Sequence, residues 1–346
     1  MSDRFLASMG AVGAVIAAGL LAPVSAAGQA EATTAPANTW TLPRTADGQP
    51  DLQGVWDYRT ISPLERPTEL GTKEFFTEEE AAKFEKEENQ RQNRDLIDPD
   101  RGGLQYPPGG VIPYNEFWYD RGNKLGSMRT SLIVDPPDGR LPAWTPEGQR
   151  LADLRAAARR DDQLGHPHAD SWEDRPLQER CIVGLNAGPP MTPGAYNNNF
   201  QLLQTPGYVV IHNEMVHSAR IIPMDGGPHG SIPQWKGDSR GHWQGDTLVV
   251  DTANFKRETN LAGSSADTHL VERFTRTGAN TLFYQFTVDD ATMWTRPWTA
   301  VIPMSKSEDP IYEYACHEGN HAMTGILAGA RAQEKAAEEA ARKESK

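Results

Sequence analysis

The stretch "HLVERFTRTGANTLFYQFTVDD", which runs from His269 to Asp290, decides the fold. It is rich in β-branched and aromatic residues, the composition that favours β-strands. Thr277-Gly278-Ala279-Asn280 interrupts it with residues that form tight turns. The stretch therefore predicts two antiparallel strands joined by a short turn.

Strand-like stretches of the same composition fill the middle of the chain. The connections between them are too short for crossover helices, so the strands are expected to pair antiparallel. Gly54-Val55-Trp56, near the first strand, is similar to the opening of lipocalin-like barrels. We predict a mainly β fold, an antiparallel meander or a lipocalin-like barrel, with a few peripheral helices and long loops. The stretches are "RTSLIVD" (129–135), "FQLLQT" (200–205), "GYVVIHNEMVHSARIIP" (207–223), "GHWQGDTLVVDTANF" (241–255), "MWTRPWTAVIPM" (293–304) and "IYEYAC" (311–316).

Three helices are expected around this sheet. Thr77 can cap the first, and Glu80 can reach back to complete a capping box. Thr145 can cap the second, with Pro146 in the first helical position, where the missing N–H is not needed. The third helix closes the chain over residues 325–346 and becomes a charged tail.

The 346 residues divide by composition into four parts. Residues 1–26 combine Arg4, a long apolar run and small residues, which is the pattern of a secretory signal peptide. Residues 27–48 are expected to be a disordered linker, 49–332 a single β-rich domain and 333–346 a charged helical tail. No later run approaches the roughly 20 apolar residues that a bilayer crossing needs. The protein is therefore predicted to be periplasmic or secreted, with no membrane contact after signal removal.

The charge balance narrows the range of partners. The formal net charge is -13 at pH 7, which disfavours long-range attraction to phosphate backbones or anionic lipids. Nucleic acid is therefore not expected as a partner, whereas a small-molecule substrate or ligand is.

The two cysteines, Cys181 and Cys316, are expected to form one disulfide in an oxidising compartment. Two free thiols are the alternative. A nucleophilic Cys316 assisted by His317 is disfavoured, because neighbouring residues on an extended strand point to opposite faces.

Seven motifs together resemble a large group of exported, uncharacterised bacterial proteins. The resemblance covers nearly the whole chain after the signal, and it implies export without implying a particular reaction. Members of this group often carry another residue, such as tyrosine, at the position of His321. The motifs are "PDLQGVW" (50–56), "SLIVDPPDGR" (131–140), "RPLQERC" (175–181), "NEMVHSARIIPMDG" (213–226), "WKGDSRGHWQGDTLVVDTANF" (235–255), "VERFTR" (271–276) and "YEYACHEGN" (312–320).

The pentapeptide His317-Glu318-Gly319-Asn320-His321 matches the zinc-protease motif H-E-x-x-H. That motif requires a continuous helix, because only a helix places residues four apart on one face. The preceding stretch is strand-like, and Gly319 and Asn320 favour a turn or a cap. We therefore expect a helix that begins near Asn320 or His321, with His317 and Glu318 in the turn before it.

A second histidine cluster lies in "VVIHNEMVHSAR" (209–220). A hairpin that turns at Asn213-Glu214 would place His212 and His217 on one face and Arg220 on the other. In that arrangement His212 pairs with Met215 and Val210 pairs with His217.

These histidines define the predicted catalytic and metal site. His212, His217 and His317 are candidate ligands of one divalent metal such as zinc, with Glu214 or Glu318 as a fourth ligand or a base. Such a site requires His217 and His317 within about 5 to 7 Å of each other. The alternative for each histidine, including His166, His168 and His229, is a surface or hydrogen-bonded structural role.

The predicted function combines this site with polar and aromatic residues. The candidate catalytic residues are His217, His317, Glu318 and Arg220, and the candidate substrate contacts are Asn198, Asn199, Trp235, Arg240 and Trp298. Histidine and carboxylate acid–base chemistry, with or without a metal, suits hydrolysis, elimination or isomerisation of a small organic or sugar-like substrate. The alternative is a periplasmic protein that binds or carries a small ligand without turnover, which the nine tryptophans favour.

Overall fold

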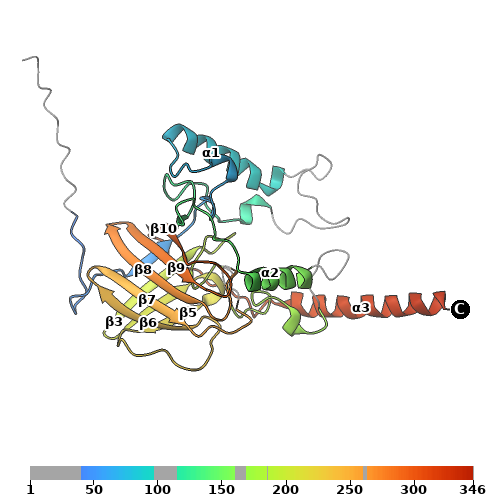
Figure 1. Ribbon diagram of the computed structural model, residues 1–346. Coiled ribbons are helices and arrows are strands. Elements are labelled where there is room, and N and C mark those ends of the chain that lie inside the picture. The colour runs from blue at the N-terminus through green and yellow to red at the C-terminus, as the bar shows by residue number, and fades with distance from the viewer. Residues whose placement is uncertain (1–39, 97–114, 160–168, 185, 260–262, 346) are drawn as a thin grey trace, which may run out of the picture. The chain divides into compact units, whose positions relative to one another are not determined.

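The structure is a computed structural model that describes residues 40–345 apart from 97–114, 160–168, 185 and 260–262. Ten strands form one sheet, and every pairing in it is antiparallel (Figure 1). The mainly β prediction is therefore confirmed. The strands are β1 (Gly54–Asp57), β2 (Ile133–Asp135), β3 (Asn199–Thr205), β4 (Tyr208–Asn213), β5 (Ala219–Pro223), β6 (Asp238–Gln244), β7 (Thr247–Ala253), β8 (His269–Gly278), β9 (Thr281–Asp289) and β10 (Trp298–Ser307).

The strand order is β5-β4-β3-β1-β10-β9-β8-β7-β6, with β2 paired to β10 outside this path. The first strand in the chain thus lies in the middle, between β3 and the last strand. The two ends of the path, β5 and β6, lie in contact but form no ladder in the described residues. The barrel alternative is therefore wrong as a closed barrel, and the meander alternative holds.

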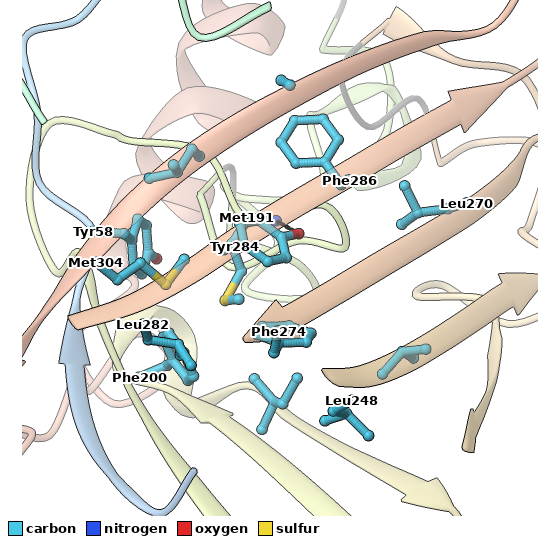
Figure 2. Packing of buried hydrophobic residues seen from close by; sticks show 14 of the residues in the cluster. Tyr58, Met191, Phe200, Leu248, Leu270, Phe274, Leu282, Tyr284, Phe286 and Met304 are labelled. Atoms are coloured by element: carbon cyan, nitrogen blue, oxygen red, sulfur yellow. Dashed lines mark hydrogen bonds between the residues drawn. The ribbon is translucent and has the colours of Figure 1, made fainter. Parts of the chain in front are cut away.

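The sheet bends around one apolar core, part of which Figure 2 shows. Phe200 of β3 and Phe274 of β8 have ring centroids 6.5 Å apart, although β1, β10 and β9 separate their strands. Phe274 also packs on Tyr284 of β9, with centroids 4.8 Å apart. Burial of each such aromatic side chain stabilises the fold by about 1.5–3 kcal/mol. The curvature therefore follows from side chains of distant strands filling one interior.

The decisive hairpin forms as predicted. β8 and β9 pair from His269↔Asp289 to Gly278↔Thr281, and the turn lies at Ala279-Asn280, the second half of the predicted 277–280. Alternate residues are buried along both strands, so one face of the hairpin belongs to the core.

Three helices accompany the sheet: α1 (Glu78–Gln92), α2 (Pro146–Arg159) and α3 (His321–Glu344). Thr77 and Glu80 form the predicted capping box on α1. The Thr145 hydroxyl accepts a hydrogen bond from Gly148 N at 2.9 Å and so caps α2. Within the described part of the chain, no helix is long and apolar enough to span a membrane.

One predicted strand is absent. Residues 311–316 form no strand in the structure, and Tyr312 N donates to the Glu214 side chain at 3.1 Å instead of to a neighbouring strand. The predicted signal peptide (1–26) and the linker as far as residue 39 lie outside the described residues. The rest of the linker prediction, residues 40–48, contains a bridge between Arg44 and Pro50.

Candidate functional site

The connection between β4 and β5 lies within the second histidine cluster of the sequence, "VVIHNEMVHSAR" (209–220). Its pairing differs from the predicted hairpin: His212 pairs with Ala219 and Ile211 with Arg220. Five residues, 214–218, therefore form the loop. Val216 and His217 have φ values of 57° and 38°, which are strained for residues with a side chain. The loop needs this backbone because Glu214 is buried and accepts hydrogen bonds from Asn199 Nδ2 at 2.9 Å and Tyr312 N at 3.1 Å.

The structure brings His217 and His317 together. Their ring centroids lie 6.4 Å apart, inside the range that a shared site requires, and both side chains are exposed. His217 Nδ1 lies 3.3 Å from the carbonyl oxygen of Tyr314. Glu318 is exposed beside His317 in a turn before α3, as the sequence predicted for "CHEGN".

The disulfide holds this turn in place. Cys181 and Cys316 are bonded, which confirms the predicted pair. Asn320 caps α3 by accepting from Met323 N, and its Nδ2 donates to the carbonyl of Glu179 at 2.8 Å. His317 therefore belongs to a turn that is tied to residues 179–181, and the H-E-x-x-H pentapeptide does not lie on one helix.

His212 does not complete a three-histidine site. In the ranges that the structure describes, no group of three or more His, Cys, Asp or Glu side chains is placed to share a metal ion. His229 instead contacts Asp251 at 2.7 Å and Asp238 at 3.4 Å, and His269 contacts the other oxygen of Asp251 at 2.7 Å. His166 and His168 lie outside the described residues.

Four of the five predicted substrate contacts are engaged within the protein, through hydrogen bonds, an ion pair or packing in the core. Asn198 is fully buried, donates to the carbonyl of Asp120 at 2.8 Å and accepts from Gly194 N at 2.7 Å. The Asn199 amide donates to Glu214, and Arg240 pairs with Asp238 at 3.3 Å. Trp298 is fully buried in the core against Phe286 and Trp294. The fifth contact, Trp235, lines a cleft.

A buried ion pair lies behind that cleft. Arg220 on β5 donates from both terminal nitrogens to Glu272 on β8, at 2.6 and 2.9 Å. Tyr284 donates its hydroxyl to Glu272 at 2.7 Å and accepts from Met191 N at 3.1 Å, a bond that Figure 2 shows. Burial, and then the charge of Glu272, raise the pKa of Tyr284 well above its ordinary value, so the phenol stays protonated and donates. Arg220 is thus fixed in one orientation.

The cleft itself opens where the sheet fails to close. It has a volume of about 550 Å³ and is lined by β5 residues 219–221, by residues 233–239 before and at the start of β6, and by Ile182 and Lys256. Lys256 Nζ lies 4.2 Å from the centre of the Trp235 ring. Gly237 has φ 69°, and a Cβ there would overlap Thr252 and the carbonyl of Ala253. Glycine at this position therefore lets the segment that carries Trp235 and Lys236 lie against β7.

Two basic side chains of the cleft, Lys236 and Arg220, can each bind a further partner. Burial, and then the positive charge of Arg220, lower the pKa of Lys236 from 10.5 to about 8. Its amine contacts the Ser218 hydroxyl and the carbonyl of Ala219, and within the described residues it has no carboxylate partner. The buried Nε of Arg220 likewise has no acceptor in the described part of the chain. An unpaired buried donor is costly, so a ligand acceptor at this point would be stabilising.

Asp238, at the edge of the cleft, does not neutralise these cations. Burial favours its neutral form, but the Gly230 amide and Arg240 outweigh burial and lower its pKa. Its charge is therefore matched by Arg240, whose Nη2 lies 3.3 Å away.

Two other clefts, of about 610 and 740 Å³, contain charges that are already paired. In the first, Arg91 pairs with Glu88 at 2.6 Å. In both, Arg121 lies 2.6 Å from Glu116. Size therefore does not distinguish the cleft at β5, whereas the Lys236 amine, which has no carboxylate partner in the described residues, does.

Sequence reasoning missed Lys236, Ser218, Glu272 and Tyr284. Glu272 carried a signal, because it shares the alternation of Leu270 and Phe274 and so had to face the core. Lys236 carried none, since its burial depends on the loop before β5.

Comparisons with known proteins give no further guide: no family model, no curated protein and no solved structure matches this chain.

Proposed function

We propose that this protein is an exported enzyme that binds a small organic anion in the cleft at β5 and moves a proton with the Lys236 amine. The predicted signal peptide and a disulfide, which is compatible with an oxidising compartment, support export. The observation that carries the proposal is one cleft lined by Lys236, whose amine has no carboxylate partner in the described residues, and by Arg220, whose buried Nε has no acceptor there although Glu272 balances its charge.

The division of roles follows from the surroundings of each cation. Arg220 is held by Glu272 through two hydrogen bonds, so its Nε–H is preorganised to donate a hydrogen bond to one carboxylate oxygen of a ligand. Lys236 has a pKa of about 8, so about a tenth of its side chains are neutral at pH 7. A base with a pKa near the working pH is well suited to proton transfer. Among the predicted reaction types, elimination and isomerisation beside a carboxylate use both roles.

Proton exchange tests this proposal without knowledge of the substrate. The protein is incubated in D₂O with succinate, lactate and phenylacetate in turn, and proton NMR follows loss of C–H signals beside the carboxylate. Binding of each probe is measured by calorimetry. We expect binding to at least one probe and exchange that Lys236→Met abolishes, while Lys343→Met, on α3, leaves both unchanged.

Each other outcome decides between the alternatives. Binding that depends on the cleft without exchange supports the rival, a protein that binds or carries a small anion without turnover. No binding, or binding and exchange that are unaffected by Lys236→Met, overturns the assignment of the cleft.

A second candidate is a divalent metal held by His217 and His317, which their 6.4 Å ring separation favours. Zinc binds imidazole nitrogen at about 2.0–2.1 Å, so small side-chain rotations would let the two rings share one ion. Zinc titration followed by the imidazole NMR signals tests this candidate. We expect both rings to respond together and His317→Ala to remove the response of His217; independent responses would contradict a shared ion.

A further inference from the structure

We propose that Lys236 Nζ forms an imine with the carbonyl carbon of a small oxo-carboxylic acid whose carboxylate is bound by Arg220. This inference rests on the proposed function, because it names the substrate class of the same cleft and gives the amine a covalent role.

The placement of the amine supports nucleophilic attack. Lys236 lines the cleft, and its Nζ is positioned by Ser218 Oγ on the adjoining loop, with the Ala219 carbonyl 3.5 Å away. In the described residues no carboxylate pairs with it, so no ion pair has to be broken before the lone pair is free. Burial together with the neighbouring Arg220 cation keeps part of the amine neutral, which is how a lysine is activated for Schiff-base chemistry.

The way Glu272 binds Arg220 indicates which group of the ligand Arg220 would hold. Glu272 binds both terminal nitrogens, and Nε is the guanidinium nitrogen without an acceptor among the described residues. One donor on a fixed guanidinium suits one oxygen of a carboxylate. A ligand that satisfies Arg220 and offers an electrophile to Lys236 therefore carries a carboxylate and a ketone or aldehyde. Trp235 gives the cleft an apolar wall for the carbon chain between them.

The reaction is balanced without any other reactant. The neutral amine adds its lone pair to the carbonyl carbon, and the carbonyl oxygen takes a proton to give a carbinolamine. The hydroxyl group then leaves as water, with one proton from nitrogen, and a C=N bond replaces C=O. No atom is oxidised or reduced. Ser218, in contact with Nζ, is a positioning residue that can pass the proton between nitrogen and oxygen. A proton from water then converts the imine to its protonated form, the electron pair of a neighbouring C–H bond moves toward the C=N carbon to give an enamine, and the proton of that bond passes to water. Reprotonation of the carbon followed by addition of water to the C=N bond reverses the first steps and releases the product.

Reductive trapping tests this inference directly. The full chain is mixed with pyruvate or acetoacetate at neutral pH, reduced with sodium borohydride, digested and mapped by mass spectrometry. We expect one reduced adduct per chain, on Lys236, with at least one of these probes. Lactate, which has a hydroxyl group instead of the carbonyl, should give none. Lys236→Arg should abolish the adduct, whereas Lys256→Arg, on the same cleft, should retain it.

Two further measurements keep the result interpretable. Circular dichroism melts of both variants show that loss of the adduct is not loss of the fold. Ser218→Ala should slow adduct formation and leave its final amount unchanged, which a purely structural role would not do. Adducts scattered over many lysines, or none on Lys236 although pyruvate and lactate both bind, would overturn the imine and leave the proton-transfer proposal standing. If neither probe binds and no proton exchange occurs with any anion, both proposals are overturned.

Discussion

Replacing Lys236 by methionine should stabilise the protein at neutral pH, although it removes the proposed base. In the native state this ammonium group is largely buried and lies near Arg220, so its charged form is disfavoured there. Methionine has similar length and no charge, and it fills irregular space well. The variant therefore removes the free-energy cost of holding a buried positive charge near Arg220 in the folded state.

The magnitude follows from the pKa. A change from 10.5 to about 8 is about 2.5 pKa units, and at roughly 1.36 kcal/mol per unit it corresponds to about 3 kcal/mol. Loss of the contact with Ser218 offsets about 1 kcal/mol of this. We expect Lys236→Met to raise the free energy of unfolding by about 2 kcal/mol at pH 7.

The pH dependence gives the prediction its sign. Between pH 8 and 10.5 the unfolded chain retains the proton of Lys236 while the native state has lost it, so wild-type stability from this group rises with pH. Below about pH 8 the lysine is protonated in both the native and the unfolded state, so the full free-energy cost of burying its charge is present. The advantage of Lys236→Met should therefore be largest at pH 7 and nearly vanish at pH 10.

Urea unfolding of both proteins at pH 7 and pH 10, followed by tryptophan fluorescence, measures this difference. Lys236→Arg is the matched control, because arginine stays charged at both pH values and cannot regain stability in alkali. A destabilised methionine variant at pH 7, or an advantage that is the same at both pH values, would refute the burial of a charged amine in this cleft.

Three other substitutions test features away from this amine. Replacing Cys181 and Cys316 with alanine opens a connection of 135 residues, which the chain-entropy model values at about 5 kcal/mol, so the urea midpoint without reductant should fall markedly; an unchanged midpoint would contradict it. Glu272→Gln leaves a buried guanidinium with a weaker partner and should cost about 3–5 kcal/mol in thermal melts, whereas Arg220→Met combined with Glu272→Met should cost less. If the double change costs more, the ion pair is a net stabiliser. Gly148→Ala should lower the melting temperature despite alanine's higher helix propensity, because the added methyl group would overlap the backbone carbonyl of Met293, which lies against α2. A raised melting temperature would refute that contact.

Much of the fold could be predicted because its signals are local. The β8–β9 hairpin follows from composition and one turn, and the caps at Thr77 and Thr145 follow from helix-end chemistry. The strand predicted at 311–316 failed because strand formation also needs a paired partner strand, which no local pattern encodes, and Tyr312 N bonds to the Glu214 side chain instead.

The candidate site was less predictable for the same reason. His217 and His317 were paired correctly because each lies in a dense polar motif beside the disulfide. Arg220 was expected to face away from His212, and it does. Arg220 pairs with Ile211 and so shares its face, whereas His212, the next residue on β4, points to the other face. Lys236 could not be found, because its lowered pKa arises from burial and from the charge of Arg220, which only the tertiary structure brings near it.

The central position of β1 has a consequence for how the chain acquires its structure. β3, β4 and β5 can assemble through short connections, and so can β6 to β10, but only Gly54–Asp57 joins these two groups into one sheet. Val55 must meet Ser307 at the far end of the domain before that junction exists. Such non-local pairing makes folding slow. A ribosome-bound chain that lacks β10 would therefore present one unpaired side of β1, and the intact sheet can form only after synthesis has passed residue 307.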